Sequence, residues 1–279
     1  MKMRLKTKTM RWCLGSTLFL LAGLACAQDS VDRVTVPFSD PSRPKTVHVN
    51  LLNGGIVVRG YAGKDVLVEA RPHNGERRRV PERAQGMHRI DAAGTGLSVE
   101  EADNIVEIKT AAWNSGADIV VQVPYATSLK LKTVNDGDIV AEHINGDVEV
   151  DDLNGKVTLT NISGSALVHA LNGKIVVTFD RITQGKVMSF SSLNGDIDVT
   201  FPPDLRANVK VKTDNGEAYS DFDIKLDPNA RKPEVERGNA NDGRFRVKFE
   251  RGTWGTINGG GPDMQFTTLN GNIFIRSRK

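Results

Sequence analysis

Residues 144–173 read INGDVEVDDLNGKVTLTNISGSALVHALNG, a nine-residue repeat in which each glycine follows Asn or Ser and, before that, Leu or Ile. The same word recurs as Leu52-Asn53-Gly54, Leu193-Asn194-Gly195 and Leu269-Asn270-Gly271. Counted from these seven glycines, positions −2, +2 and +4 are apolar in all 21 cases, and positions +3 and +5 are polar in 10 of 14. This alternation is typical of β-strands with one buried face, so the chain is predicted to be all-β.

An Asn-Gly pair between apolar runs usually predicts a two-residue hairpin turn. Such a turn would place the aliphatic residue at −2 beside position +1 on one face, and +1 is Asp, Lys, Ser or Asn in six of the seven registers. A glycine in line with the strand instead lets positions −2, 0, +2 and +4 all face inward. We therefore predict a single-domain β-solenoid, or β-helix, with two nine-residue sides per coil and coils of roughly 18–22 residues. An antiparallel β-sandwich or meander is the alternative.

The solenoid makes two predictions about contacts. Val148 should stack on Ala166 and Val157 on Ile175, whereas a meander would pair residues 148–150 with 157–159. The inward positions should form one continuous core: Val148, Val150, Leu153, Val157, Leu159, Leu171, Ile175, Val177, Leu193, Ile197 and Val199.

Three segments carry a further pattern: Asp118–Pro124 (DIVVQVP), Thr133–Ile139 (TVNDGDI) with the repeats after it, and the closing run Gly255–Ile273. They resemble the bacterial DUF4097 family, a group of adhesin-like proteins related to the head domains of autotransporter adhesins. The resemblance covers roughly residues 45–279 and implies an exported, non-enzymatic, β-helical module. It implies no catalytic residues. The extra residue in Asn135-Asp136-Gly137 departs from the simple Asn-Gly word.

Residues 1–27 are predicted to be a cleaved export signal. A basic segment precedes an apolar run from Leu14 to Ala25, which is shorter than the roughly 20 residues that span a membrane. Ala25-Cys26-Ala27 fits a small-x-small cleavage pattern and makes Gln28 the first mature residue. Lipidation of Cys26 is the alternative. Cleavage after Ala27 would also remove Cys13, so the mature chain is expected to contain no thiol and no transmembrane span.

The charge of the chain argues against a nucleic-acid binder. The formal net charge is +3, from 37 Lys and Arg against 34 Asp and Glu. Five of the basic residues and none of the acidic ones lie in residues 1–27, so removal of that segment leaves 32 against 34. A dedicated nucleic-acid binder carries its basic excess in the folded part.

Three segments do not follow the repeat. Residues 28–44 are polar and are predicted to be an N-terminal tail or linker before a solenoid domain over residues 45–279. Residues 71–89 and 227–242 are rich in proline and charge, and we predict that they are excursions from the β-core.

Two ligand classes can be weighed against this plan. The arginines from Arg77 to Arg83 could bind an anionic glycan or another polyanion, but Glu76 and Glu82 dilute their charge, which favours a solvated loop. A nine-residue glycine period also occurs in calcium-binding toxin repeats, which carry several glycines and an Asp in each turn. Here each unit has one glycine, and Lys156 and Lys174 occupy positions where a cation would have to bind.

Catalytic motifs are scarce. Paired acids could serve a glycosidase or lyase, and the candidates are Asp136 with Asp138, Asp151 with Asp152, and Asp196 with Asp198. Acids on the solvent face of a strand are more often solubilising residues. The histidines, at 48, 73, 88, 143 and 169, show no zinc-binding spacing, and the sequence has neither a phosphate loop nor a nucleophile elbow. We predict no catalytic, cofactor-binding or metal-binding residue.

Together these features predict an exported, non-enzymatic β-solenoid in the periplasm or at the cell surface. It would act as a structural or adhesive module whose partner is an envelope glycan or protein. A carbohydrate-active β-helix enzyme that acts on an envelope or extracellular polysaccharide is the alternative, and a periplasmic sensor or scaffold is a weaker one.

Overall fold

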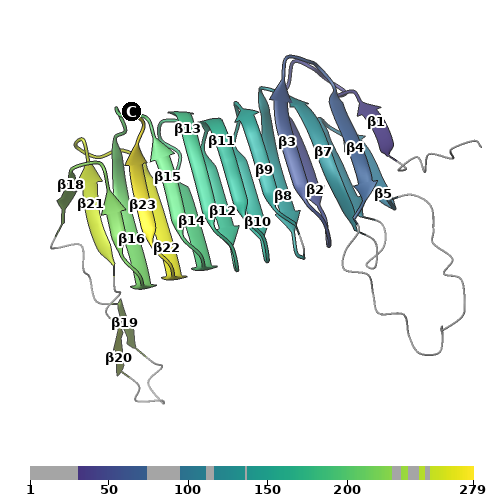
Figure 1. The fold of residues 1–279 in the computed structure, drawn as a ribbon. Helices are drawn as coiled ribbons and strands as arrows, with labels where there is room; N and C mark the ends of the chain where they lie inside the picture. Colours follow the sequence, from purple (N-terminus) through teal and green to yellow (C-terminus); the bar gives the residue numbers. More distant parts are fainter. Residues whose placement is uncertain are drawn as a thin grey trace, which may run out of the picture.

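The chain folds into an elongated stack of β-strands, with no helix among the residues that the structure describes (Figure 1). The structure is a computed structural model that describes residues 31–73, 95–110, 116–135, 137–227 and 252–279, and the backbone of 234–237 and 245–248. The predicted export signal, the possible lipid site at Cys26, and the arginines from Arg77 to Arg83 lie outside the described residues. The all-β prediction is confirmed.

Two large sheets lie face to face. In spatial order, sheet A contains β1 (Asp32–Val36), β4 (Val66–Pro72), β7 (Ala117–Pro124), β3 (Ile56–Tyr61), β9 (Ile139–Ile144), β11 (Val157–Gly164), β13 (Ile175–Ile182), β15 (Ile197–Phe201), β23 (Ile273–Ser277) and β17 (Ala218–Ser220). Sheet B contains β18 (Ile224–Leu226), β21 (Thr253–Ile257), β16 (Ala207–Asn215), β22 (Asp263–Asn270), β14 (Met188–Asn194), β12 (Ala166–Ala170), β10 (Val148–Asp152), β8 (Thr127–Thr133), β2 (Lys45–Asn50), β6 (Ile105–Thr110) and β5 (Leu97–Ala102). A separate two-stranded sheet pairs β19 (Glu234–Arg237) with β20 (Phe245–Lys248).

Each central coil is one strand of sheet B followed by one strand of sheet A. Val148 pairs in parallel with Ala166, and Val157 pairs in parallel with Ile175, so one circuit takes 18 residues. The next circuit is longer, because Val168 pairs with Phe190. These registers confirm the two-sided solenoid and exclude the antiparallel sandwich or meander.

The order of the coils departs from the sequence at both ends. The first coil, β2–β3, does not lie at the end of the stack. On its outer side β2 pairs with β6 and β3 pairs with β7, although β6 and β7 come later in the sequence. The last coil, β22–β23, is inserted between β14–β15 and β16–β17. Antiparallel strands close the ends: β5, β4 and β1 at one end and β21 and β18 at the other.

The core fills the space between the sheets, and most of its predicted members are buried. The confirmed residues are Val148, Val150, Val157, Leu159, Ile175, Val177, Ile197 and Val199. Four phenylalanines, Phe179, Phe190, Phe201 and Phe266, stack in two pairs near the C-terminal end of this core. Removal of this apolar surface from water is the main force that holds the coils together.

The predicted burial of Leu153, Leu171 and Leu193 is wrong. Leu153 is 38% exposed and Leu193 is 37% exposed, and Leu171 is half-buried. Strict alternation explains this result: Val148, Val150 and Asp152 face inward, so the next residue, Leu153, faces outward. At these corners the residue three places before glycine, and not the leucine, completes the inner face.

The other corner of the coil behaves differently because it contains a bulge. Ile144 and Ile162, which also stand two places before glycine, are fully buried. The residue before each isoleucine is a non-glycine with a positive φ, 58° at His143 and 57° at Asn161. A residue in this left-handed conformation adds one position to the strand and reverses which side chains face inward. The two corners of one coil therefore place the same sequence word on opposite faces.

The glycines of the Leu-Asn-Gly corners stack directly on one another. A Cβ atom added to Gly173 would lie 1.7 Å from the carbonyl oxygen of Gly155, and one added to Gly155 would lie 2.2 Å from that of Gly137. Only glycine permits this approach of one backbone to the next. The glycines are therefore required by the distance between coils, and not by a hairpin turn.

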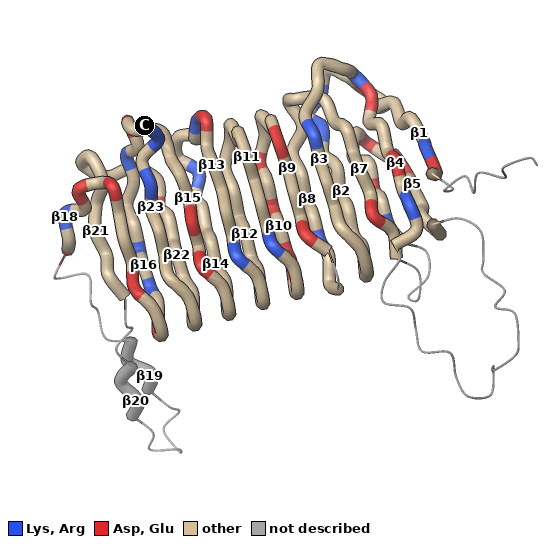
Figure 2. Tube along the Cα trace, viewed as in Figure 1, with Lys and Arg blue, Asp and Glu red and all other residues tan. Residues whose placement is uncertain are grey.

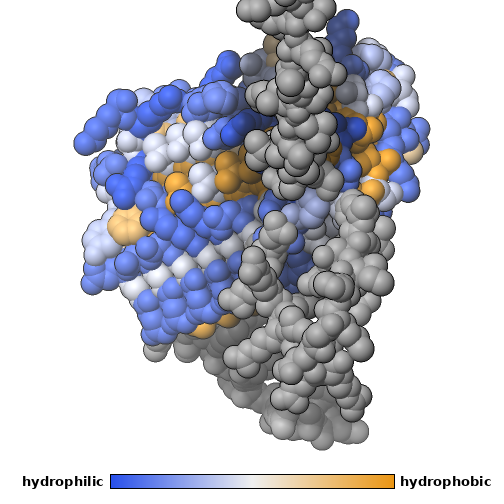
Figure 3. Space-filling view, turned by 45° about the vertical axis from the view of Figure 1, so that its right-hand side comes forward, coloured by the Kyte–Doolittle hydropathy of each residue, from blue (hydrophilic) through white to orange (hydrophobic). Residues whose placement is uncertain are grey.

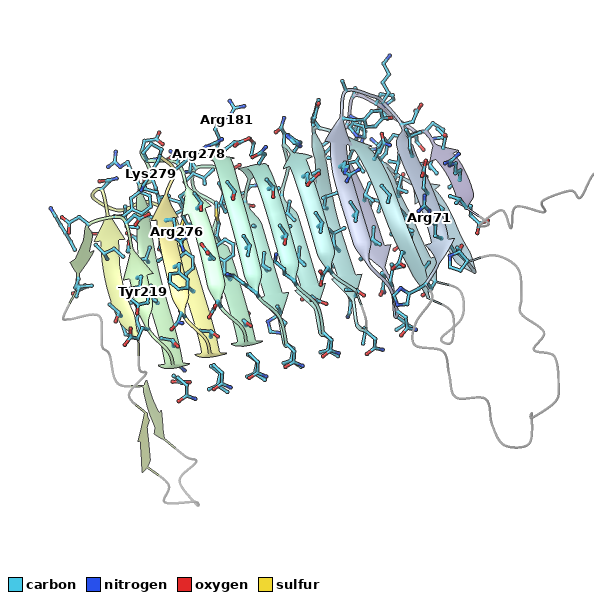
Figure 4. The ribbon with its side chains drawn as sticks, viewed as in Figure 1. Arg71, Arg181, Tyr219, Arg276, Arg278 and Lys279 are labelled. Atoms are coloured by element: carbon cyan, nitrogen blue, oxygen red, sulfur yellow. The ribbon has the colours of Figure 1, made fainter. Side chains whose placement is uncertain are left out.

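The asparagines of the same corners form a hydrogen-bonded ladder along one edge of the solenoid. The Asn172 amide donates to Asn154 Oδ1 at 2.9 Å, Asn194 donates to Asn172, and Asn270 donates to Asn194, each of the last two at 2.7 Å. The ladder is interrupted at the extra residue of the Asn135-Asp136-Gly137 corner, where Asn154 donates to the Val134 carbonyl instead. Figure 4 shows the repeating row of side chains along this edge.

The structure describes parts of all three segments outside the repeat. Residues 28–44 are not all tail, because β1 (Asp32–Val36) pairs with β4 and Phe38 is buried. The excursion predicted from residue 71 begins later, because Arg71 and Pro72 belong to β4; residues 74–94 lie outside the described part. The predicted excursion at 227–242 contains β19, which pairs only with β20 in the described structure.

Candidate binding surfaces

Three acids near the start of strands in sheet A bind backbone groups of the neighbouring coil. Asp118 Oδ1 accepts the Gly55 N–H, Asp138 Oδ1 accepts the Lys156 N–H, and Asp196 Oδ1 accepts the Asn272 N–H, each at 2.8 Å. These bonds join one coil to the next at the point where the strands of sheet A begin. Lys156 therefore contributes its main-chain amide to this contact. The Asp side chains at +1 accept backbone N–H groups, although their position in the repeat resembles that of a calcium ligand.

The other members of the acid pairs have different surroundings. Asp198 forms an ion pair with Arg276, whose Nε lies 2.7 Å from Oδ1, and Lys174 lies 4.0 Å from Oδ2. Asp151 faces outward and Asp152 faces the core. Asp136 lies outside the described residues. The structure therefore does not bring Asp151 and Asp152 together as a pair that faces one site.

Asp152 occupies a position where its equivalents are hydroxyl residues or apolar residues. Its register partners are Thr133 and Ala170, and further along the same inward row lie Ser192 and Thr268. The Thr133, Ser192 and Thr268 hydroxyls each donate to the carbonyl of a corner glycine in the neighbouring coil, at 3.0–3.1 Å. Asp152 is 4% exposed, and neither carboxyl oxygen makes a hydrogen bond of good geometry.

The buried position changes the acidity of this carboxyl group. Burial, with a smaller contribution from the nearby Asp138 carboxylate, raises the pKa of Asp152 to about 6, although the backbone amides of Asn154, Gly155 and Leu153 partly oppose the rise. A protonated carboxyl would resemble the hydroxyl residues of the same row, because it too could donate a hydrogen bond. Asp152 is thus a core group and does not face either sheet surface.

The described histidines are scattered along the solenoid. His73 Nδ1 lies 2.8 Å from Asp118 Oδ1, His143 Nε2 lies 3.0 Å from the Asn161 amide, and His169 Nδ1 lies 2.7 Å from the Ser191 hydroxyl. His48 lies 3.9 Å from Glu107, and His88 is outside the described residues. Among the residues that the structure describes, no three His, Cys, Asp or Glu side chains are grouped so that they could hold a metal ion.

The outer face of sheet A carries a cavity of about 720 Å³ where β4 and β7 meet β3 and β9. Val57, Val120 and Val140 form its apolar floor, and Arg71 and Asp118 are among its polar lining residues. Figure 3 shows an apolar strip of this kind, bordered by hydrophilic residues, on the face that it presents. Another cavity, of about 350 Å³, lies between β1 and β5 at the same end.

At the other end of sheet A, aromatic and basic side chains are exposed together. Tyr219 stacks on Phe274 with ring centroids 5.4 Å apart, and the Arg276 guanidinium lies 5.2 Å from the Phe274 ring. Figure 4 shows Tyr219 and Arg276 at this end of the molecule and Arg71 at the opposite end. Basic and acidic residues are interspersed along the described solenoid (Figure 2).

The outer face of sheet B carries a cavity of about 480 Å³ near its C-terminal end. Its lining includes Trp254 from β21, Lys210 and Asn208 from β16, and Asp263 and Gln265 from β22. The sequence prediction missed all of these residues, because none belongs to the repeated word. One signal was present: the step from Gly173 to Gly195 is 22 residues instead of 18, and Val187, which lies within this longer step, lines the cavity.

No helix in the described part of the chain has the length and apolar character needed to cross a membrane. Searches with the whole structure find similar chains of low sequence identity. A candidate cell adhesion protein from Clostridium sporogenes matches with a TM-score of 0.48 and 13% identity, over 89% of this chain and 100% of that one. A candidate adhesin from Bacteroides fragilis matches with a TM-score of 0.32 and 12% identity, over 89% of this chain and 97% of that one. Neither likeness bears on function.

No relative is found among curated proteins. The family model described as Toastrack DUF4097 matches residues 45–253, which is most of the chain and includes the central coils. The matched region begins at the first residue of β2, where the solenoid itself begins. The chain therefore belongs to the Toastrack DUF4097 family.

Proposed function

We propose that this protein is an exported, non-enzymatic β-solenoid that acts as a structural or binding module at the bacterial cell envelope. The observation that carries the proposal is the use of its acids. Asp118, Asp138 and Asp196 each accept a backbone N–H from the next coil, and Asp198 is paired with Arg276. Carboxylates held in this way stabilise the stack of coils, and they are poorly suited to exchange protons with a substrate.

Export is supported by the first 27 residues of the sequence. They combine a basic start, an apolar run from Leu14 to Ala25 and a small-x-small cleavage pattern that ends at Ala27. A mature chain without cysteine must obtain its stability from its core, and the continuous core between the two sheets suits that requirement.

One observation favours the alternative of a carbohydrate-active enzyme. Asp118, Asp138 and Glu69 all line the 720 Å³ cavity on sheet A, and glycosidases use pairs of carboxyl groups. Two of these carboxylates already have charged or polar partners, which weakens the case for an enzyme: Glu69 pairs with Arg33 and Asp118 with His73. The carboxyl with the raised pKa, Asp152, faces the core instead of this cavity.

Export is tested by expressing the full chain with a C-terminal tag in a bacterial host and analysing the processed protein by mass spectrometry. The expected mature protein starts at Gln28 and appears outside the cytoplasm. A diacylglyceryl mass on Cys26 that disappears in Cys26→Ser would show that the mature protein has a lipid anchor and does not start at Gln28. Retention of an uncleaved chain in the cytoplasm would reject export.

Binding and catalysis are separated by two assays on the same processed protein. Sedimentation with purified envelope fractions measures binding, and release of reducing ends from the polysaccharides of those fractions measures hydrolysis. Binding without hydrolysis is expected. Hydrolysis that is lost in Asp118→Asn would establish the enzyme instead.

A further inference from the structure

Six outward side chains of sheet B form two rows across three neighbouring strands. The register places Lys210 of β16 opposite Trp254 of β21 on one side and opposite Gln265 of β22 on the other. In the adjacent row, Asn208 lies opposite Thr256 and opposite Asp263. Paired strands are about 4.8 Å apart, so each row presents three side chains within about 10 Å.

Irregular parts of the chain form the walls around these rows. Thr183 to Val187 is the connection inside the 22-residue circuit, which is longer than the 18-residue circuits before it. Val187 from this connection lines the cavity and is 61% exposed. On the other side, Trp254 lies on β21, a closing strand that runs antiparallel to β16. The cavity of about 480 Å³ thus lies where two departures from the repeat meet, and its volume is in the usual range for small-ligand sites.

Three sets of contacts hold the residues of the cavity in place. The Asn208 amide nitrogen donates to the Gly261 carbonyl and to Asp263 Oδ1, both at 2.9 Å, which fixes the two side chains relative to each other. The Lys210 ammonium lies 5.4 Å from the centre of the Trp254 ring. The Asp227 N–H donates to the Trp254 carbonyl at 2.9 Å, which ties the tryptophan strand to the residue after β18. Groups fixed before binding lose little conformational entropy when a ligand arrives.

We propose that this cavity is a binding site for a neutral saccharide, with a sugar ring against Trp254 and its hydroxyl groups on the polar rows. The proposal rests on the proposed function, because it names the ligand class of a binding module. A tryptophan offers an apolar face with a polar edge, which suits a ring that has C–H groups on its faces and hydroxyls around its rim. Carboxylate, amide, hydroxyl and ammonium groups together supply both acceptors and donors for those hydroxyls.

The charges of the cavity favour a neutral ligand. The lining residues include one basic side chain, Lys210, and two acidic ones, Asp227 and Asp263. A polyanion would meet these two carboxylates, and a polycation would meet the ammonium group beside the aromatic ring. A hydroxyl-rich ligand without charge can instead bond to groups of both signs. Its binding should therefore depend only weakly on salt concentration.

The test uses tryptophan fluorescence of the processed full chain. The sequence has three tryptophans, at 12, 113 and 254, and the first lies in the predicted signal, so Trp113→Phe leaves Trp254 as the reporter. Neutral gluco-, xylo- and chito-oligosaccharides of three to six residues, and acidic uronic-acid oligosaccharides of the same length, are titrated to 10 mM, and calorimetry repeats any positive titration. Saturable binding by at least one of them, with little change between 50 and 300 mM salt, is expected.

Variants then assign the binding to this cavity. Trp254→Ala should weaken the affinity measured by calorimetry at least tenfold, Trp254→Phe less, and Asn208→Ala about three- to tenfold. Tyr219→Ala, which removes an exposed aromatic ring from the opposite sheet, is the matched control and should bind as the parent chain does. Circular dichroism and the Tm verify that each variant is folded, and Asn208→Ala and Trp254→Phe keep the test informative if Trp254→Ala unfolds.

Two outcomes would overturn the proposal: no saturable binding of any neutral saccharide at 10 mM, or binding that is unchanged in both Trp254→Ala and Asn208→Ala. Binding restricted to acidic saccharides, with strong salt dependence, would also reject it in favour of an anion site. The sedimentation assay distinguishes this failure from failure of the proposed function. An envelope interaction that persists in Trp254→Ala and Asn208→Ala would keep the binding module and reject this cavity as its site.

Discussion

The central coils and the two ends of the solenoid contain the same kind of strand but differ in regularity. From β8 to β13, the strands of each sheet follow one another in space as they do in sequence, with steps of 18 or 19 residues. At the ends the order of coils changes and antiparallel strands close the sheets. The cavities of about 480 and 350 Å³ lie at the ends, and the cavity of about 720 Å³ extends from the closing strand β4 to β9.

This difference separates two tasks within one fold. A repeat that places every residue on the equivalent residue of the next coil fills the core and satisfies the backbone, but it produces smooth faces. Recesses arise where the repeat is broken, by the connection at Thr183–Val187 or by the closing strands β4 and β21. Substitutions in the centre should therefore affect stability, and substitutions at the breaks should affect binding.

The largest expected effect is a substitution at a stacked glycine of the central coils. Gly173→Ala would place a Cβ atom 1.7 Å from the Gly155 carbonyl oxygen, and two backbones would have to move apart. We expect a loss of at least about 3 kcal/mol in the free energy of unfolding, measured by chemical denaturation.

The matched control for Gly173→Ala is Gly185→Ala, in the connection between β13 and β14. A Cβ atom on Gly185 would meet no atom within 4 Å, although its φ of 77° is unfavourable for alanine. That conformation costs about 1–2 kcal/mol. Equal destabilisation by the two substitutions would contradict the requirement for glycine stacking in the centre.

A smaller effect is expected from the core leucine of a central coil. Leu159 is fully buried, so Leu159→Ala should cost about 2–5 kcal/mol through lost burial and a new cavity. Leu153, six residues earlier, is 38% exposed, and Leu153→Ala should cost less than about 1 kcal/mol. Thermal unfolding of the two variants measures the difference. A similar fall in Tm for both would mean that the inward position of Leu159 and the outward position of Leu153 are wrongly assigned.

Asp152 is an irregular residue within the regular centre, and we expect it to lower the stability of the fold at neutral pH. Its pKa in the folded state, about 6, is above the ordinary value of 3.8, so the folded protein binds the proton more tightly than the unfolded chain. The resulting stabilisation is fully present below about pH 4 and is lost as the pH rises through 6. Between pH 4 and 7 we expect a loss of roughly 2 kcal/mol, because one pKa unit corresponds to about 1.4 kcal/mol and most of the shift is expressed in this range.

Asp152→Thr should abolish that pH dependence, because Thr is the residue at the equivalent positions Thr133 and Thr268. The variant should be more stable than the parent chain at pH 7 and equal to it, or slightly less stable, at pH 4. Denaturant titrations at the two pH values measure both quantities. A parent chain that is as stable at pH 7 as at pH 4 would show that Asp152 does not control this behaviour.

The smallest effect concerns the asparagine ladder. Asn172 both donates to Asn154 and accepts from Asn194, so Asn172→Ala removes two hydrogen bonds and should cost about 1–2 kcal/mol. Asn135→Ala lies at the interrupted corner and removes one bond, of 3.3 Å, to Asn53; it should cost less than about 1 kcal/mol. If the two substitutions lower the free energy of unfolding equally in denaturant titrations, the ladder in the centre adds no more stability than the single hydrogen bond at the interrupted corner.

The local repeat was sufficient to predict the class of fold and its circuit length. Apolar residues at +2 and +4, glycine in line with the strand, and a nine-residue step required strands, corners and a two-sided coil, because each feature acts between residues close in sequence. The pairing of Val148 with Ala166 and of Val157 with Ile175 follows from that step.

Tertiary structure decided which face the residue before each Asn-Gly or Ser-Gly pair occupies. Leu153 and Ile162 stand in the same word, yet only the isoleucine is buried, because Asn161 adopts a positive φ and reverses the alternation. Tertiary structure also placed the last coil between two earlier ones and set Trp254, Lys210 and Asn208 around one recess. These features depend on pairing between strands tens of residues apart, and the free energy of such pairing comes from the complete stack, which no local pattern records.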